Sequence, residues 1–399
     1  MAEDAPPLVG RRLREIRVWR GLSLRAAAEL SGLSASYLSR IERGERPVER
    51  RSTLEALAAA LRVAPSELTG STIRATEDPE SGPAVAALRL TLADAEMGEP
   101  VEIDARPWPE VASALDAVNA IRPRADYAAL GERLPALILE LHAHLPGQNR
   151  RPALAGLVDC YSAAQALAKN LGVPDLAQVA SRHVRDAAAA LSGPEWAGLA
   201  AWSRAQAISS TARDRSFAVA VRGAEEVAGD LDRPEVADVY GSLHLTAALA
   251  AITLGRTDTA ADHLAEAGEV AARPGVGTGF GNLWFSAGNV DIWRTMLAVE
   301  QGKGGRAVEI ARAVDPATLP SSPSRRAAWW IDIGRGLAME RGTRDEAVGA
   351  FLTAEQLAPQ RFRGNVFARE VVTDLLARAR RDAGDRELRG MAYRMGVAG

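Results

Sequence analysis

The stretch SLRAAAELSGLSASYLSRIERG, residues 23–44, decides how the N-terminal part of the chain folds. Ser23 and Ser34 each precede a helical pattern, and serine is a preferred N-cap because its hydroxyl oxygen accepts a backbone N–H of the first turn. Gly32 lies between the two patterns, where a tight turn favours a residue that tolerates a positive φ. Two helices joined by a short turn with a glycine form a helix-turn-helix unit. The sequence therefore predicts such a unit here.

Helical patterns on both sides of this unit extend it to a small domain. Apolar residues recur every three or four positions before and after it, and Pro65 opens a last short helix. The sequence therefore predicts a five-helix domain within residues 1–70, with helices over 8–20, 24–30, 35–43, 52–61 and 65–68.

This domain resembles the DNA-binding domain of the Cro/CI (XRE) repressor family. The resemblance spans residues 8–70 and rests on small, apolar and capping residues at fixed spacing. These residues are Gly21, Leu22, Ser23, Ala28, Gly32, Leu33, Ser34, Leu38, Ser39, Ile41, Glu42 and Gly44. The resemblance implies a lambda-repressor-like fold whose third helix binds double-stranded DNA, and an ion pair between Arg17 and Glu42.

The outward side of the predicted third helix supplies the candidate base contacts. Leu38 and Ile41 point into the core, so the residues between and before them point outward. An α-helix fits the major groove, where an arginine can bind guanine O6 and N7 with two hydrogen bonds. We therefore expect base reading, in order of expectation, by Arg40, Ser36, Ser39 and Ala35, the last at most through a thymine methyl group. The arginines placed for the DNA backbone are Arg25, Arg43, Arg46, Arg50 and Arg51.

Behind this domain the sequence predicts a linker and a helical repeat region. Residues 71–83 are rich in Gly, Pro, Ser, Thr and acidic residues, a composition typical of a linker. From 84 to 399 the patterns are alanine-rich and helical, without the alternation that predicts strands. A small residue followed by apolar residues four and seven positions later recurs at steps of 40 to 47 residues, as in the second helix of a tetratricopeptide repeat (TPR). The copies begin at Ala180, Ala220, Ala260, Ala307 and Ala347.

The expected fold is therefore all-α. A lambda-repressor-like DNA-binding domain (1–70) is followed by a linker (71–83) and a degenerate TPR-like α-solenoid (84–399). Three stretches, 285–311, 324–351 and 387–397, also resemble a group of actinobacterial regulators that join an XRE domain to such repeats. The residues that we associate with this group are Phe285, Asn289, Arg294, Trp330 and Asp332.

The first helices of such repeats line a concave surface, and here they carry aromatic and polar residues. Aromatic side chains with a few converging polar groups are typical of a small-molecule or peptide pocket. Alternatively, the tryptophans fill helix junctions in an alanine-rich core. The candidate ligand-binding residues are Trp202, Gln206, Tyr240, Asn289, Trp293, Arg294, Trp330 and Asp332, with His244 and Trp329 beside them.

Composition and charge limit the class of protein. The net charge of −3 divides into +3 over residues 1–70 and −6 over the rest, which suits a nucleic-acid reader attached to another domain. No apolar run approaches the roughly 20 residues of a membrane span, so no membrane partner is expected. The N-terminal MAEDAPPLVG lacks a secretory apolar core, and the single cysteine, Cys160, cannot form an intrachain disulfide. We expect a cytoplasmic protein.

No nucleophile–base pair, carboxylate dyad or metal-ligand spacing stands out, so we expect no enzymatic activity, no cofactor and no metal. Two functions remain open. The chain is either a homodimeric, sequence-specific transcriptional regulator that senses a small molecule or peptide, or a DNA-tethered scaffold whose repeats bind a partner protein. An enclosed aromatic pocket would favour the first function, and an open polar groove the second.

Overall fold

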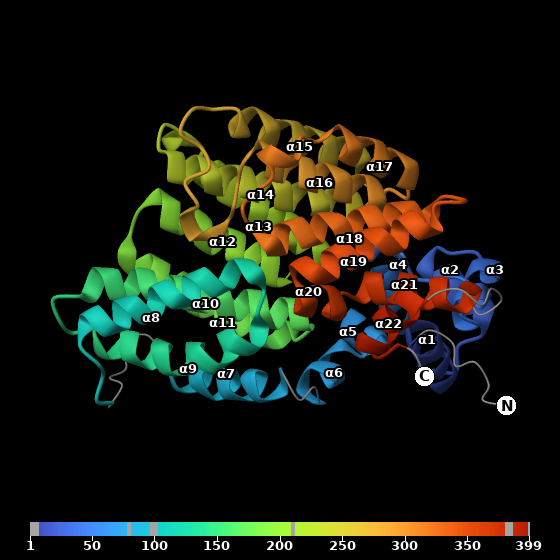
Figure 1. Ribbon diagram of the computed structural model, residues 1–399, viewed down its shortest axis with the longest axis horizontal. Helices are drawn as coiled ribbons and strands as arrows, with labels where there is room; N and C mark the ends of the chain where they lie inside the picture. Colours follow the sequence, from blue (N-terminus) through green and yellow to red (C-terminus); the bar gives the residue numbers. More distant parts are fainter. Residues whose placement is uncertain (1–7, 78–80, 96–102, 209–211, 380–385, 398–399) are drawn as a thin grey trace. The chain divides into compact units, whose positions relative to one another are not determined.

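The computed structural model describes residues 8–77, 81–95, 103–208, 212–379 and 386–397 (Figure 1). Within these residues the regular elements are helices and no strand occurs, which confirms the predicted all-α fold. The first five helices are α1 (Leu8–Trp19), α2 (Leu24–Ser31), α3 (Ala35–Glu42), α4 (Arg51–Leu61) and α5 (Pro65–Thr69).

The helices that follow are α6 (Ser71–Glu77), α7 (Gly82–Asp94), α8 (Trp108–Ile121), α9 (Tyr127–Ala143), α10 (Arg150–Leu171), α11 (Pro174–Leu191), α12 (Pro194–Ile208), α13 (Arg213–Val227), α14 (Pro234–Thr253) and α15 (Thr257–Ala271). The C-terminal helices are α16 (Ala287–Glu300), α17 (Gly304–Ala313), α18 (Pro323–Met339), α19 (Arg344–Leu357), α20 (Pro359–Gly364), α21 (Val366–Ala379) and α22 (Arg386–Arg394).

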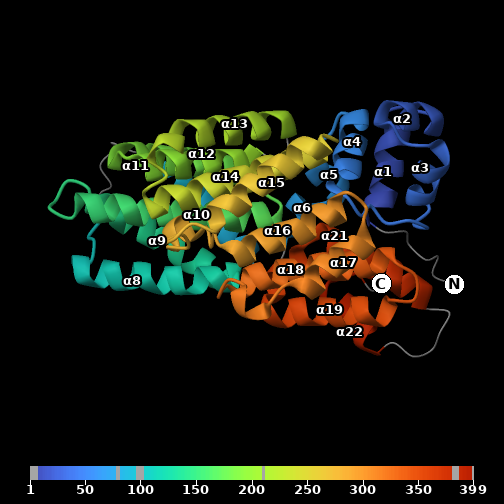
Figure 2. The same ribbon diagram turned by 90° about the horizontal axis from the view of Figure 1, so that it is seen from above.

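The helix-turn-helix unit forms as its caps predict. The hydroxyl oxygen of Ser23 accepts the N–H of Ala26 and that of Ser34 accepts the N–H of Tyr37, each over 3.1 Å. Gly32 ends α2 with a φ of 67°, a left-handed conformation that glycine adopts without steric cost. Helices α1 to α4 appear in blue in Figure 2.

A close approach of α1 to α3 holds the unit together. A Cβ added to Gly10 would lie 2.2 Å from the carbonyl oxygen of Ile41, so only glycine fits at this contact. Leu13, Leu38 and Ile41 are almost fully buried in the shared core. This core fixes which face of α3 remains outside.

The described residues group into two compact units that differ from the predicted division of the chain. One, here called the head unit, comprises Met1–Ile73, Thr295–Ala313 and Ala327–Gly399, and the other, the repeat unit, comprises Arg74–Arg294 and Val314–Arg326. The C-terminal part of the predicted solenoid thus packs with the N-terminal domain. The sequence pattern did not reveal this because each repeat is predicted to contact its sequence neighbours.

Residues 71–83 also differ from the prediction. The sequence predicted an irregular linker, whereas α6 occupies Ser71–Glu77 and α7 begins at Gly82. The predicted linker residues 78–80 lie outside the described residues. Ser, Thr and Glu also occur in exposed helices, and the buried Ala75 gives α6 a packing face, so composition alone was misleading.

The predicted repeat pattern matches the helix pairs. The small residues that begin its copies are buried and lie on the second helix of successive pairs. Within the repeat unit, α10 to α15 each pack against the next helix and lie side by side in both views (Figures 1 and 2). The residues concerned are Ala180 on α11, Ala220 on α13, Ala260 on α15, Ala307 on α17 and Ala347 on α19.

Helix α14 is long and apolar enough to span a membrane by length and composition alone, with a mean hydropathy of 1.3 over its window. The sequence interpretation missed it because Asp238 and His244 interrupt the apolar run. However, 78% of the window is buried, and α14 packs against α12, α13 and α15. These contacts are those of a core helix of the repeat unit.

Candidate functional site

The exposed side of α3 is the first candidate site. Leu38 and Ile41 are buried, and the side chains on the opposite side of the helix remain accessible to solvent. Ala35 and Ser36 are exposed, and Ser39 and Arg40 are half-buried. The structure therefore places the four predicted base-reading residues together on an accessible helix face, the arrangement that a major groove requires.

Glu45 holds two of the arginines at this face. Its carboxylate accepts two hydrogen bonds from Arg43, over 2.6 and 2.9 Å, and lies 3.9 Å from Nε of Arg40. Arg43 also donates to the hydroxyl of Ser39. The hydrogen bonds from Arg43 lower the pKa of Glu45, so the carboxylate stays charged. A DNA phosphate or guanine would have to replace Glu45 as their partner.

The other arginines predicted to contact the DNA backbone differ in their exposure. Arg25 is strongly exposed and donates to Glu29 over 3.0 Å, and Arg46 is exposed. Arg50 is half-buried and precedes α4. Arg17 and Glu42 form the ion pair that the resemblance implied, with Nη2 and Oε2 separated by 2.8 Å.

Arg51 has a different role from the one predicted. Its guanidinium forms an ion pair with Glu300 on α16 and lies 5.1 Å from the ring centre of Phe367 on α21. Its backbone N–H donates to the same carboxylate over 2.8 Å. Arg51 therefore has a structural role in place of the predicted DNA contact. The sequence did not indicate this role because the partner, Glu300, lies 249 positions away.

Glu300 and Arg335 form a buried ion-pair network under the helix-turn-helix unit. Arg335 donates to Glu300 over 2.7 Å, to Asp332 over 2.6 Å and to the backbone carbonyl of Glu49 over 2.6 Å. Burial would raise the pKa of Glu300, but the guanidinium groups of Arg51 and Arg335 lower it to about 2. Asp332, predicted to bind a ligand, is instead an internal partner of Arg335.

Helix α21 supplies a second contact to the same unit. The carboxylate oxygens of Glu370 lie 3.5 Å from the backbone N–H groups of Val9 and Val48, and Phe367 belongs to the core of the helix-turn-helix unit. Burial raises the pKa of Glu370 to about 7, although both N–H groups oppose the shift. In the sequence, the feature that could have indicated this contact is an acidic residue among the apolar residues of α21.

Asn289 remains the clearest candidate for ligand binding among the residues predicted. It is 1% exposed near the start of α16, and its side-chain oxygen has no hydrogen-bond partner among the described residues. Buried amide oxygens are normally bonded, so this one is available to a donor. Two other predicted ligand residues lie on the same helix. Trp293 is buried, and Arg294 forms an ion pair with Asp291.

The other predicted ligand residues form contacts between helices. Gln206 accepts a hydrogen bond from Lys169 and donates to Thr246 over 2.9 Å. The hydroxyl of Tyr240 donates to Glu266 over 2.9 Å, and its ring lies 4.5 Å from that of His244.

The predicted tryptophans differ in their exposure to solvent. Trp329 is buried and donates to the hydroxyl of Thr295 over 3.2 Å, which fits the filling of a helix junction. Trp202 and Trp330 are half-buried. Trp330 and Asp332 belong to the head unit, whereas Trp202 and the other predicted ligand residues belong to the repeat unit.

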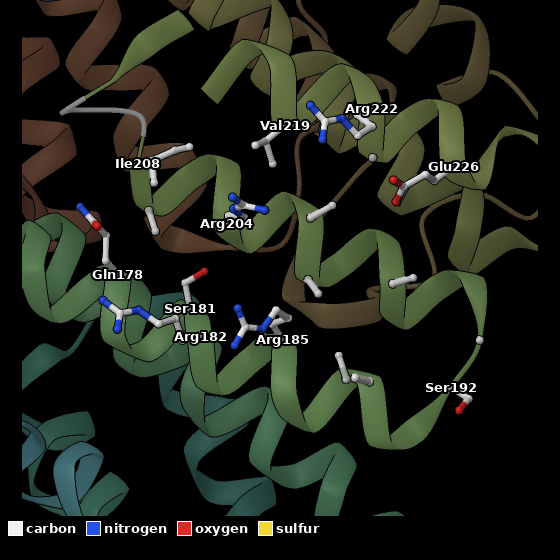
Figure 3. Close-up of a pocket in the computed structure, with 18 residues that line it drawn as sticks. Gln178, Ser181, Arg182, Arg185, Ser192, Arg204, Ile208, Val219, Arg222 and Glu226 are labelled. Carbon is white, nitrogen blue, oxygen red and sulfur yellow. The ribbon is translucent and has the colours of Figure 1, made fainter. Parts of the chain in front are cut away.

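A groove of about 710 Å³ lies elsewhere in the repeat unit, between α11, α12 and α13 (Figure 3). None of the predicted ligand residues lines it. Alanines form much of its lining, and Arg182, Arg185, Arg204 and Arg222 surround them. Sequence reading missed these arginines because each one alone is typical of a solvated helix surface.

Comparison with known proteins supports the N-terminal assignment. Residues 8–69 match a family model described as a helix-turn-helix domain. A comparison with curated proteins gave no match. Among solved structures, the chain is similar to PlcR of Bacillus thuringiensis, in a crystal structure with the peptide PapR7 and DNA, at 16% identity and a TM-score of 0.28. That alignment covers 66% of this chain and 94% of PlcR.

The capped helices α2 and α3, the accessible face of α3 and the family match agree with one another. The N-terminal part of the chain is a DNA-binding helix-turn-helix domain, followed by helical repeats.

Proposed function

We propose that the protein is a sequence-specific, DNA-binding transcriptional regulator whose repeats sense a small molecule or peptide and mediate dimerisation. The observation that carries this proposal is the accessible face of α3 within a helix-turn-helix domain. We place its action in the cytoplasm and assign it no catalytic role.

In this proposal Arg40 reads a guanine in the major groove, with Ser36, Ser39 and Ala35 as neighbouring contacts. Arg25, Arg43, Arg46 and Arg50 contact phosphates and set the orientation of α3 on the duplex. When DNA binds, a phosphate replaces the carboxylate of Glu45 as the hydrogen-bond partner of Arg43. Binding is therefore expected to depend steeply on salt.

Helix α16 offers a route from a ligand to the DNA-binding domain. Asn289 lies near its start and Glu300 at its end, and Glu300 binds Arg51 at the start of α4. A ligand that donates to Asn289 more favourably in one position of α16 would shift the population of that position. In a homodimer, such a shift would change the separation of two recognition helices, which contact half-sites about one helical turn apart.

A DNA-tethered scaffold is the second candidate function. It is favoured by the groove of the repeat unit, whose described lining includes none of the predicted aromatic side chains. Its repeats would bind a partner protein, and the DNA-binding domain would only localise the assembly.

The test is selection of binding sites from random duplex DNA by the full-length chain at one stated salt concentration. An enriched inverted repeat supports a dimeric regulator that reads sequence. An enriched single site contradicts the dimer only. Recovery of no enriched sequence contradicts sequence-specific binding and favours the scaffold.

A further inference from the structure

The groove between α11, α12 and α13 is built from one face of each helix. Helix α11 contributes Gln178, Arg182 and Arg185, which are four and three positions apart and so share a face. Helix α13 contributes Arg222 and Glu226 at the same kind of spacing. In Figure 3 the labelled side chains of α11 lie below those of α13, and Arg204 of α12 lies between them.

Helix α12 forms the floor of the groove with small side chains. Ala197, Ala200, Ala201 and Ala207 line it, and Arg204 is the charged residue of this helix in the groove. Alanine leaves space where a larger side chain would fill it, so the floor is apolar and open. The described lining contains no aromatic side chain.

The charges of the groove are unbalanced. Arg182, Arg204 and Arg222 are exposed, and the described residues offer them no carboxylate partner. Arg185 pairs with Asp186 over 2.8 Å, and Glu226 is the acidic residue of the lining. Because the whole chain has a net charge of −3, this local excess of positive charge is not a property of the overall composition. Concave basic surfaces concentrate anions.

We propose that this groove binds a small aliphatic polyanion whose carboxylate or phosphate groups are held by Arg182, Arg204 and Arg222. The planar guanidinium group matches both anions with paired hydrogen bonds. The hydrocarbon part of the ligand lies on the alanine floor, and the lack of aromatic lining offers a nucleobase no stacking partner. The volume of about 710 Å³ lies in the range of ligand pockets, roughly 300–1,000 Å³. This inference rests on the proposed function, for which it names the class of effector.

Isothermal titration of the full-length chain with propane-1,2,3-tricarboxylate and with 1,4-butanediol bisphosphate tests the proposal in its carboxylate and phosphate forms. We expect at least one of them to bind once per chain. The double variant Arg204→Gln/Arg222→Gln should weaken that binding at least tenfold, and Arg273→Gln, an exposed arginine outside the groove, should leave it unchanged. Ala200→Leu, which fills the floor without changing charge, should also weaken it.

The proposal is overturned if neither probe binds more strongly than chloride at equal ionic strength. It is also overturned if the double variant binds the probe as well as the original chain does. Binding of duplex DNA by the double variant separates this result from the proposed function. Unchanged DNA binding is expected, whereas loss of DNA binding in parallel with probe binding would make DNA the occupant of the groove. If no DNA site is selected but binding of the probe still requires Arg204 and Arg222, the proposed anion site is supported and the proposed regulatory function is contradicted.

Discussion

The backbone N–H of Arg51 donates to the side-chain carboxylate of Glu300 over 2.8 Å. Arg51 begins α4 of the helix-turn-helix domain, and the N-cap residue Arg50 offers no side-chain hydrogen bond there. The first N–H groups of a helix need acceptors, and its N-terminus favours a negative charge. A residue from α16 therefore supplies the cap that the local sequence lacks, and it ties the DNA-binding domain to the C-terminal helices.

The variant Glu300→Gln should destabilise the head unit. It removes the negative charge between the guanidinium groups of Arg51 and Arg335, and loss of one partner of a buried ion pair costs about 3 kcal/mol or more. Urea unfolding measures the change. The control is Glu309→Gln, whose exposed pair with Arg306 should contribute less than about 1 kcal/mol. Equal effects of the two variants would contradict the structural role of Glu300.

Glu370 should make stability depend on pH. Because burial raises its pKa from 4.5 to about 7, the folded chain keeps the proton over a range in which the unfolded chain releases it. Its contribution is present below about pH 4.5 and is lost as the pH rises to about 7, on the order of 3 kcal/mol. Urea unfolding between these pH values should show a larger loss of stability in the original chain than in Glu370→Gln. Parallel pH profiles would show that Glu370 titrates normally.

Glu45→Gln should strengthen DNA binding. The change frees Arg43 and Arg40 from a carboxylate that competes with phosphate. We expect severalfold tighter binding to all sequences at low salt, with a smaller gain at high salt because the added interaction is screened. Fluorescence anisotropy across a salt series measures it, with Glu309→Gln as the control. Weaker binding by Glu45→Gln would mean that Glu45 orients the arginines for DNA.

Gly10→Ala should disturb the contact between α1 and α3. The new Cβ would meet the carbonyl oxygen of Ile41 at 2.2 Å, and relief of such overpacking costs about 1–3 kcal/mol. Gly349→Ala on α19 is the matched control, since its Cβ would meet no atom within 4 Å. The control should stabilise its helix by roughly 0.5–1 kcal/mol. Thermal unfolding measures both effects. Equal shifts of the midpoint temperature in the two variants would contradict the close contact between α1 and α3.

The parts of the fold that depend on local sequence were predictable. Ser23, Ser34 and Gly32 identify the ends of α2 and α3 because caps and left-handed turns require particular residues. The recurring small residues, such as Ala180 and Ala347, identify the second helices of the pairs because those positions have little space. Both signals are carried by single residues at fixed spacing.

The contacts between distant segments were not predictable. Arg51 resembles any other surface arginine until Glu300 is placed beside it, and Asp332 resembles a ligand residue until Arg335 is seen to bind it. In the groove, Arg182 and Arg222 lie on helices whose packing brings them together. A single sequence gives the residues but does not show which helix faces pack against each other. A charged residue in a buried ion pair therefore cannot be told from one on the surface.

The most direct measurement is the affinity of the original chain and of Arg40→Ala for two duplexes at one salt concentration. One duplex is the selected site, and the other has a single guanine of that site replaced. We expect Arg40→Ala to lose about 1–3 kcal/mol of binding free energy on the selected site and little on the altered one, so the preference between them disappears. We expect Arg43→Ala to weaken binding to both duplexes alike. An unchanged preference in Arg40→Ala would contradict the assignment of α3 and Arg40 as the reader of DNA sequence.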